Sequence, residues 1–152
     1  MSLRKWRTKL KIIGVEFDAN RACYVAVEGE DAEDVAMVSW GTVRLEETRD
    51  APAARSFAGE VARILATVSP TVVAIKAKPE NGQMRAGAAA LKMEAILLAE
   101  APCEVVFLSP QRLKPIQDRD GLYAYLQGAW KAAVGGFDPP AKKKPSSRTG
   151  KA

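Results

Sequence analysis

The sequence predicts an α/β fold in which a five-stranded mixed sheet carries helices on both faces. Short β-branched runs at residues 12–15 and 71–75 have the length and composition of buried strands. Apolar residues at helical spacing fill the segments between the later runs. The resulting order is three strands, then helix, strand, helix, strand and helix. Three antiparallel strands followed by right-handed crossovers between parallel strands satisfy this order.

The first third of the chain predicts an antiparallel meander. Its first strand ends in Glu16 and Asp18, and a two-residue connection, short enough for a hairpin, leads to a second strand at residues 21–28. An acidic turn precedes the third strand at residues 35–45, in which Gly41 is expected to form a bulge.

The segment that begins near Pro52 predicts the first helix, because proline suits the first helical turn. Ser69 and Pro70 end it, and the strand at residues 71–75 is expected to be buried on both faces and parallel to the first strand. The apolar residues of the helix share one face: Phe57, Val61, Ile64, Leu65 and Val68.

The last third predicts a helix at residues 84–100, a strand at 103–108, a loop or single turn at 109–115 and a final helix that starts at Asp120. The small residues 86–90 either pack tightly against the sheet or leave room for a ligand. The buried face of the final helix is expected to contain Leu122, Leu126, Ala129, Trp130 and Ala133.

The composition indicates one cytoplasmic domain with a substantial core. The chain has 152 residues, 47% of them hydrophobic, and contains no apolar run long enough to span a bilayer and no apolar signal-peptide core near its start. Cys23 and Cys103 are expected to be reduced and buried. The absence of histidine excludes Ser-His and Cys-His catalysis and histidine-based zinc sites. Acid–base chemistry would then fall to Glu, Asp, Lys or Tyr.

The positive charge is concentrated at the two ends of the chain. Residues 1–11 and 141–152 each carry five basic residues and no acid, so the remainder holds 13 basic residues against 18 acidic ones. We therefore expect a basic arm at residues 1–11, a folded domain at 12–137 and a flexible basic tail at 138–152. Such arms contact nucleic-acid phosphates or serve only as solubilising tails.

The best candidate site lies where the first strand ends. Alternation places Glu16 and Asp18 on one side of that strand, and buried carboxylates are costly unless they are paired or bind a metal. Asp18 has a second interpretation, in which it only opens the following turn. The loop at residues 76–80 is expected at the same sheet edge, which Asp118 and Asp120 are also able to reach.

The element order is that of the ribonuclease H-like fold, and short motifs point the same way. The segment from Ile13 to Glu16 reads Ile-Gly-Val-Glu and resembles the Ile-Gly-Ile-Asp motif of RuvC-type Holliday-junction resolvases. Residues 75–94 resemble the bacterial domain-of-unknown-function family numbered three thousand and ten, a RuvC-like family. The matching positions are Lys76-Ala77-Lys78, Gly82, residues 86–90, Leu91-Lys92-Met93-Glu94 and, further on, residues 107–110 with Lys114.

The resemblance to resolvases implies a two-metal site of Mg²⁺ or Mn²⁺ held by carboxylates from strand one, strand four and the last helix. Glu16, with Asp18, would supply the first position and Asp120 the last. The strand-four ligand is expected at Ala77, which binds nothing and has a lysine on each side. The resemblance therefore supports the fold more strongly than the catalysis.

Three functions are compatible with the sequence. The first is a nucleic-acid-associated domain with a degenerate metal site and weak or no nuclease activity. The second is an active metal-dependent nuclease that uses Glu16, Asp18 and Asp120 with Glu80 or Glu94, and the third is an adaptor for a protein or ribosomal partner. Residues expected to contact DNA or RNA in the first case are Lys76, Lys78, Arg85, Arg112, Lys114, Lys142, Lys143 and Lys144.

Overall fold

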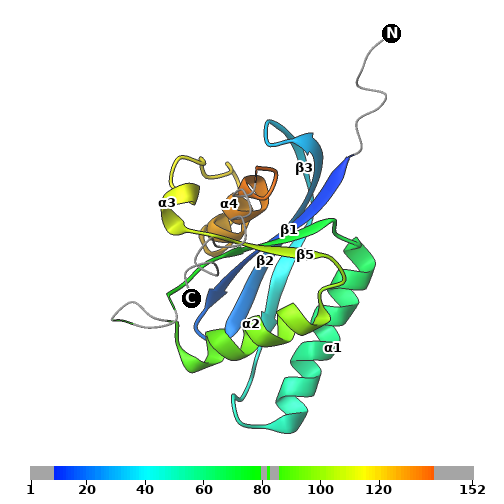
Figure 1. Ribbon diagram of the computed structural model, residues 1–152, viewed down its shortest axis with the longest axis vertical. Coiled ribbons are helices and arrows are strands. Elements are labelled where there is room, and N and C mark those ends of the chain that lie inside the picture. The colour runs from blue at the N-terminus through cyan, green and yellow to red at the C-terminus, as the bar shows by residue number, and fades with distance from the viewer. Residues whose placement is uncertain (1–8, 80–81, 83–85, 139–152) are drawn as a thin grey trace, which may run out of the picture.

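A single mixed sheet forms the centre of the molecule in the computed structural model, which describes residues 9–79, 82 and 86–138 (Figure 1). The strand order is β3-β2-β1-β4-β5; β1 is antiparallel to β2 and parallel to β4, and β5 is parallel to β4. This arrangement confirms the predicted α/β class and element order. The strands are β1 (Leu10–Asp18), β2 (Arg21–Asp31), β3 (Asp34–Arg44), β4 (Val72–Lys76) and β5 (Glu104–Leu108).

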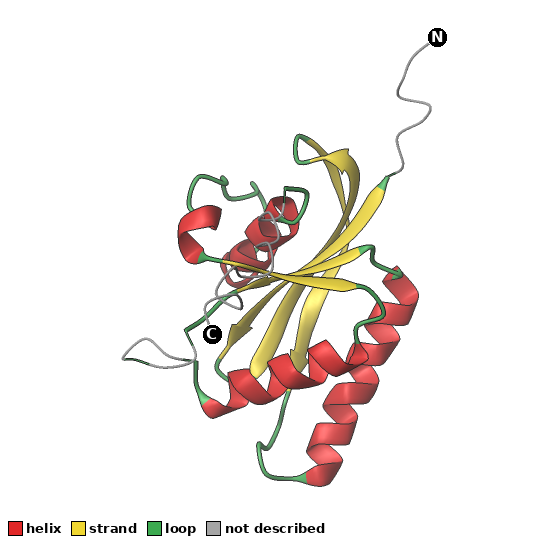
Figure 2. Cartoon of the chain, viewed as in Figure 1, coloured by secondary structure: helices red, strands yellow, loops and turns green. Residues whose placement is uncertain are grey.

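Helices cover both faces of this sheet (Figure 2). The helices α1 (Ala51–Val68) and α2 (Ala88–Glu100) lie on one face. The other face carries α4 (Gln127–Gly135), the single turn α3 (Pro110–Leu113) and the 3-10 helix η2 (Ala124–Leu126).

The sequence of α1 explains both of its ends. The Asp50 side chain caps the first turn by accepting a hydrogen bond from the Ala53 N–H at 3.0 Å, and Pro52 occupies the first turn as predicted. Ser69 ends the helix in a left-handed conformation with φ of 53°. Of the predicted apolar face, Phe57, Val61 and Leu65 are buried, and Ile64 and Val68 are partly buried against the same core.

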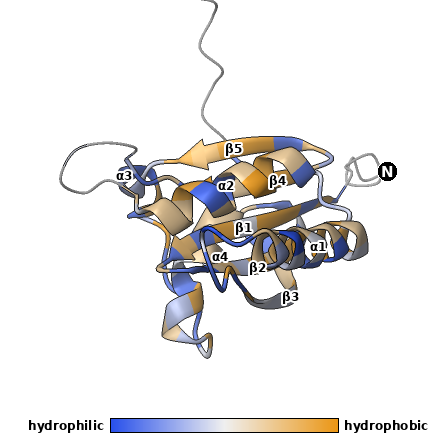
Figure 3. Ribbon diagram, turned by 90° about the horizontal axis from the view of Figure 1, so that it is seen from below, coloured by the Kyte–Doolittle hydropathy of each residue, from blue (hydrophilic) through white to orange (hydrophobic). Residues whose placement is uncertain are grey.

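Alternation along the strands divides the core into two clusters. In β1, Ile13 and Val15 face α1 and α2, whereas Ile12 faces α4. The β4 strand is buried on both faces, as its composition predicts, because Val73, Ala74 and Ile75 are completely covered. The hydropathy colouring of Figure 3 shows the apolar composition of these strands, with orange along much of β1 and β5.

Helix α4 packs directly on the backbone of β1 at Gly14. A Cβ atom at this position would lie 2.1 Å from the Ala129 carbonyl oxygen and 2.3 Å from the Ala133 nitrogen. A larger residue would push the helix off the sheet. The glycine of the Ile-Gly-Val-Glu motif is therefore a packing requirement that positions α4 over the end of β1.

Two helices start later than the sequence predicts. Helix α2 starts at Ala88 rather than residue 84, because Gly87 is extended with ψ of 172°; residues 83–85 lie outside the described residues. Helix α4 starts at Gln127 rather than Asp120, because Gly121 has φ of +81° and Tyr123 is extended. Leu126, Ala129, Trp130 and Ala133 are nevertheless buried as expected, and Leu122 is partly buried.

The bulge expected at Gly41 is also wrong. Gly41 pairs regularly with Tyr24, and a Cβ atom there would lie only 3.0–3.2 Å from the Tyr24 ring, so the glycine makes room for that ring. The ladder shifts instead between Ala26 and Val27, where Val38 of β3 is the extra residue, and again near Gly29.

The cysteine prediction holds in part. Cys23 and Cys103 are both free; Cys23 is buried as expected, whereas Cys103 is only half-buried. Burial raises the pKa of the Cys23 thiol above its ordinary value, and the positive charge of Arg21 opposes this shift.

Among the described residues, no helix is long and apolar enough to cross a membrane.

Candidate functional site

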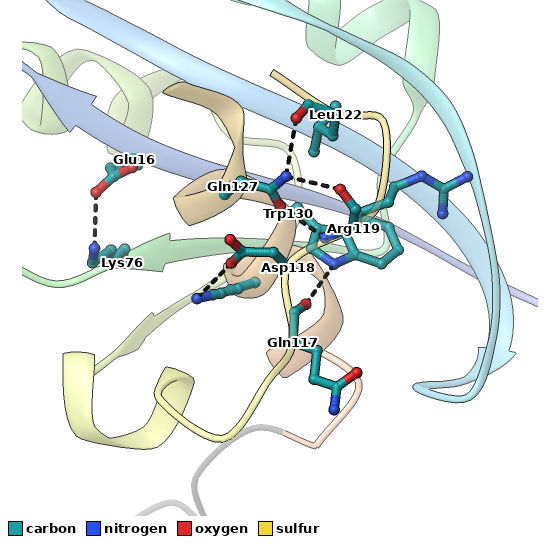
Figure 4. A network of polar contacts seen from close by, with 9 residues as sticks. Glu16, Lys76, Gln117, Asp118, Arg119, Leu122, Gln127 and Trp130 are labelled. Carbon is teal, nitrogen blue, oxygen red and sulfur yellow. Dashed lines mark hydrogen bonds and ion pairs between the residues drawn. The ribbon is translucent and has the colours of Figure 1, made fainter. Parts of the chain in front are cut away.

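Glu16 and Lys76 form an ion pair at the carboxyl edge of the two central strands. The β1–β4 register pairs Val15 with Ile75, so the next residue of each strand lies side by side. Lys76 Nζ donates to Glu16 Oε2 at 2.9 Å, and the two side chains are 32% and 22% exposed (Figure 4). The predicted proximity of Glu16 to a lysine of the strand-four exit is therefore confirmed.

The register places Lys76, and not Ala77, beside Glu16. The residue beside Glu16 is Lys76, whereas Ala77 lies one residue further and lines a cavity on the opposite face with Glu94 and Leu98. The Ala77 N–H donates to the Leu108 carbonyl at 2.9 Å and continues the β4–β5 ladder. A sequence motif contains no information on which face of the sheet each side chain occupies, so the neighbour of Glu16 could not be read from it.

Glu16 also lies against the first turn of α4. A Cβ atom at Gly128 would lie 2.0 Å from Glu16 Oε1, so only a glycine allows the carboxylate to reach this place. The start of an α-helix carries partial positive charge, which favours a carboxylate nearby. Glu16 is thus held between a lysine of the neighbouring strand and the start of a helix.

Three lysines surround a small cavity next to this ion pair, which we call the lysine cavity. It has a volume of about 130 Å³. Lys131 Nζ binds Asp118 Oδ1 at 2.8 Å, so Asp118 reaches this edge, as expected, through Lys131. Lys131 was not among the basic residues predicted from the sequence, although its place one turn after Gly128 becomes a usable signal once the start of α4 is known. The lining residues are Lys76, Pro110, Leu113, Lys114, Gly128 and Lys131.

Asp18 belongs to the β1–β2 hairpin rather than to the lysine cavity. Its side chain is 60% exposed and accepts a hydrogen bond from Arg21 Nη2 at 3.0 Å across the turn. This hydrogen bond raises the pKa of the Arg21 guanidinium above its ordinary value. The geometry matches the interpretation of Asp18 as the residue that opens the turn.

The predicted carboxylates do not fit a magnesium or manganese site. Among the described residues, no three Asp, Glu or Cys side chains form a group that is able to hold a metal ion, so Glu16, Asp18 and Asp120 do not converge. Asp120 is exposed in the loop before η2. The group beside Glu16 is the ammonium of Lys76, which repels a divalent cation. Glu80 lies outside the described residues.

The other predicted basic residues occupy separate places. Lys78 lines the cavity of about 510 Å³ that also contains Ala77, on the α2 side. The Arg112 side chain contacts Asp138, donating to its carbonyl oxygen and lying 3.9 Å from its carboxylate. Lys114 lines the lysine cavity. Arg85, Lys142, Lys143 and Lys144 lie outside the described residues.

The loop before α4 is tied to that helix by side-chain hydrogen bonds (Figure 4). Gln127 accepts from the Arg119 N–H at 2.8 Å and donates to the carbonyls of Arg119 and Leu122 at 2.8 and 3.1 Å. Trp130 Nε1 donates to the Gln117 carbonyl at 3.3 Å. These contacts fix the loop that carries Asp118 beside the lysine cavity.

The strand order and the helices on both faces of the sheet are those of the ribonuclease H-like fold. Comparison with family models then identifies the family. The model of the protein of unknown function DUF3010 matches residues 10–133, and the chain belongs to this family. A search of curated protein sequences finds no match.

Three of the solved structures that resemble this chain are two of RuvC and one of a Holliday junction resolvase. The RuvC of Thermus thermophilus matches with a TM-score of 0.67 at 14% identity, over 83% of this chain and 92% of that chain. The T. thermophilus RuvC in complex with a Holliday junction substrate matches with a TM-score of 0.63 at 14% identity, over 83% and 91%. The yeast mitochondrial Holliday junction resolvase Ydc2 matches with a TM-score of 0.54 at 11% identity, over 83% and 78%. At these identities the likeness establishes the fold.

Proposed function

We propose that this chain binds the sugar-phosphate backbone of nucleic acids with lysines at the carboxyl edge of its sheet and does not hydrolyse it with Mg²⁺ or Mn²⁺. The observation that carries the proposal is the 2.9 Å contact between Lys76 Nζ and Glu16 Oε2. An ammonium group beside the carboxylate supplies the positive charge that a metal would otherwise bring. Glu16 then acts as the partner of a lysine rather than as a metal ligand.

The charge balance of the lysine cavity supports phosphate binding. Three ammonium groups, from Lys76, Lys114 and Lys131, meet two carboxylates, from Glu16 and Asp118. Among the residues that the structure describes, one positive charge therefore remains in excess at the cavity. Phosphate oxygens are strong acceptors for lysine, and such contacts supply most of the sequence-independent affinity for nucleic acids.

The decisive experiment measures binding and cleavage together. Labelled single-stranded, duplex and four-way DNA, and RNA, are incubated with the protein in Mg²⁺, in Mn²⁺ and in EDTA. We expect a mobility shift under all three conditions and no product. Magnesium-dependent cleavage by the wild type that Glu16→Gln abolishes would show that the chain is a working nuclease and that the proposal is wrong.

The lysines are tested by replacing them with glutamine. Removing Lys76, Lys114 and Lys131 should weaken binding and flatten its salt dependence, by about 0.9 in log–log slope for each phosphate of duplex DNA that the variant no longer neutralises. Lys92→Gln is the matched control, because Lys92 lies on α2 at the opposite face of the sheet, where its ammonium donates to the Thr48 carbonyl. A control variant whose affinity falls as far as that of the triple variant would remove the support for a local site.

The two basic arms belong to the same proposal, although residues 1–8 and 139–152 lie outside the described residues. Deleting residues 141–152, which carry five basic residues and no acid, should reduce the affinity and its salt dependence without lowering the melting temperature. Unchanged binding after the deletion would restrict the interface to the folded domain.

A further inference from the structure

We propose that Trp40, Tyr123 and Tyr125, together with Arg21, form an aromatic platform that stacks the unpaired bases of single-stranded nucleic acid. This inference rests on the proposed function and makes it more specific. It adds a binding site for bases to a binding site for phosphates, and it assigns the domain a preference for single strands over duplexes.

The three rings form one continuous exposed surface. Trp40 is 44%, Tyr123 58% and Tyr125 37% exposed. Tyr123 and Tyr125 are stacked at 20° with centroids 5.6 Å apart, and Trp40 meets Tyr123 edge-on at 66° and 5.6 Å. Large aromatic rings that remain exposed in a group are a common mark of a binding surface. Tyr123 and Trp40, the two most exposed rings, offer apolar surface of the kind on which a base stacks, whereas the Tyr125 ring contacts Tyr123 and Arg21.

Positive charge adjoins the rings. The Arg21 guanidinium lies 4.9 Å from the centre of the Tyr125 ring, a cation–π contact. Arg44, which is exposed, pairs with Arg21 across the β2–β3 ladder. Arg21 is also bound to Asp18, so one acid offsets part of this charge. The two arginines at the margin of the rings are placed to meet the phosphates between stacked bases.

Two acids of β1 connect the platform with the lysine cavity, because Glu16 binds Lys76 and Asp18 binds Arg21. Asp18 and Glu16 lie on the same side of β1, two residues apart, and Asp18 binds the arginine that covers Tyr125. A single strand is therefore able to place its backbone near Lys76 and its bases on the rings. A duplex does not offer its base faces to such a surface, because they are covered by neighbouring base pairs.

The rings are held in place before any ligand binds. Tyr123 and Tyr125 follow the loop that Gln127 ties to α4 with its three hydrogen bonds, and Trp40 is carried by β3. Preorganised side chains lose little freedom on binding. This feature favours a stacking surface over a flexible segment that must fold around its partner.

The test separates bases from backbone. Fluorescence anisotropy is measured with a single-stranded DNA of about ten nucleotides, the same RNA, the same duplex and an abasic strand with identical phosphates. We expect the intact strands to bind about tenfold more tightly than the abasic one, and Tyr123→Ala to remove this difference. Tyr123→Phe should retain it. Phe107→Ala, which removes a 39% exposed ring from the opposite sheet edge, should change nothing.

A spectroscopic readout follows one ring directly. The measurement uses a Trp6→Phe background, because Trp6 lies in the basic N-terminal arm, which is also expected to bind nucleic acid. Stacking on a base should then quench the fluorescence of Trp40, whereas Trp130 is only 8% exposed. Trp40→Phe should keep most of the affinity and lose most of the quenching. Melting temperatures of every variant show whether a loss of binding reflects a loss of folding.

The outcomes distinguish the two proposals. The platform proposal is wrong if intact and abasic strands bind with equal affinity, or if Tyr123→Ala binds as tightly as the wild type. In either case the phosphate site remains supported as long as the lysine variants bind more weakly than the wild type. Binding to none of the nucleic-acid probes would overturn both, and the exposed rings would then have to serve a protein partner.

Discussion

The two faces of the sheet are used for different purposes. On the α1–α2 face, Phe57 and Leu97 pack on β1 around a cavity of about 30 Å³ that is lined by apolar residues and Tyr24. On the α4 face lie the ion pair between β1 and β4, three lysines and exposed aromatic rings, several of which come from α4 and the segment before it. Because side chains alternate along a strand, each face has its own core cluster, and only the α4 face combines its cluster with the candidate site.

The largest expected effect is a loss of stability on the α1–α2 face. Phe57 is 1% exposed in that core, so Phe57→Ala should lower the free energy of unfolding by about 3–5 kcal/mol, measured by urea denaturation. The fraction that remains folded should bind nucleic acid like the wild type. If the affinity of the folded variant falls in proportion to its stability, the two faces are not independent.

A smaller loss, this time with an effect on the site, is expected from Gly128→Ala. The added methyl group would overlap the Glu16 carboxylate, and relieving such a clash should cost about 1–3 kcal/mol of stability. The variant should also disturb the Glu16–Lys76 pair and change nucleic-acid binding. Gly59→Ala in α1 is the control: no atom lies within 4 Å of the added Cβ, and stability should rise by about 0.5–1 kcal/mol.

Acidic substitutions at two adjacent positions distinguish the faces further. Lys76→Glu would place a second carboxylate beside Glu16, whereas Ala77→Glu would point toward Glu94 of α2. We expect Mn²⁺ to stabilise the folded Lys76→Glu variant by about 1.4 kcal/mol when its concentration is ten times the Kd, which would appear as a higher melting temperature. The melting temperature of the wild type should not change. If Mn²⁺ stabilises Ala77→Glu as much as Lys76→Glu or more, residue 77 rather than residue 76 is the strand-four ligand position.

The smallest effect is a pH dependence from Cys23. Its thiol pKa is raised in the folded state by burial, so above the ordinary thiol pKa of about 8.5 the unfolded chain loses its proton first. Stability should therefore fall as the pH rises from there toward the folded-state pKa. Denaturation midpoints between about pH 7 and 10 should decline less in Cys23→Ala. If the stability of Cys23→Ala declines as much as that of the wild type, the decline comes from other groups. Tyr24 is one such group, because burial also raises its pKa.

Local patterns predicted most of the fold, because periodicity and β-branching report directly on burial. The start of α4 was missed because apolar spacing at Leu122 and Leu126 fits a helix, while the positive φ of Gly121 interrupts it. A glycine of this kind is compatible with either structure until the tertiary contacts are known. The same applies to Gly87, which begins α2 later than its alanine-rich surroundings suggest.

The sequence predicted only those residues of the candidate site that lie at the ends of strands. Glu16 and Lys76 close two adjacent strands, so the topology alone brings them together. Lys131 required the register of α4, and the aromatic platform joins Trp40 of β3 to Tyr123, which lies far along the chain beyond both crossovers. Contacts between residues so distant in sequence leave no local pattern.

The extra residue in β3 has a consequence for how the chain tolerates deletions. Val38 has no partner on β2, because Met37 pairs with Val27 and Ser39 with Ala26. Deleting Val38 would therefore leave a regular ladder in which Trp40 still pairs with Val25 and keeps its side of the sheet. Deleting Thr42, which does have a partner, would instead turn Val43 out of the α1–α2 core. The loss of a single codon is thus expected to be tolerated at one point of β3 and damaging four residues later.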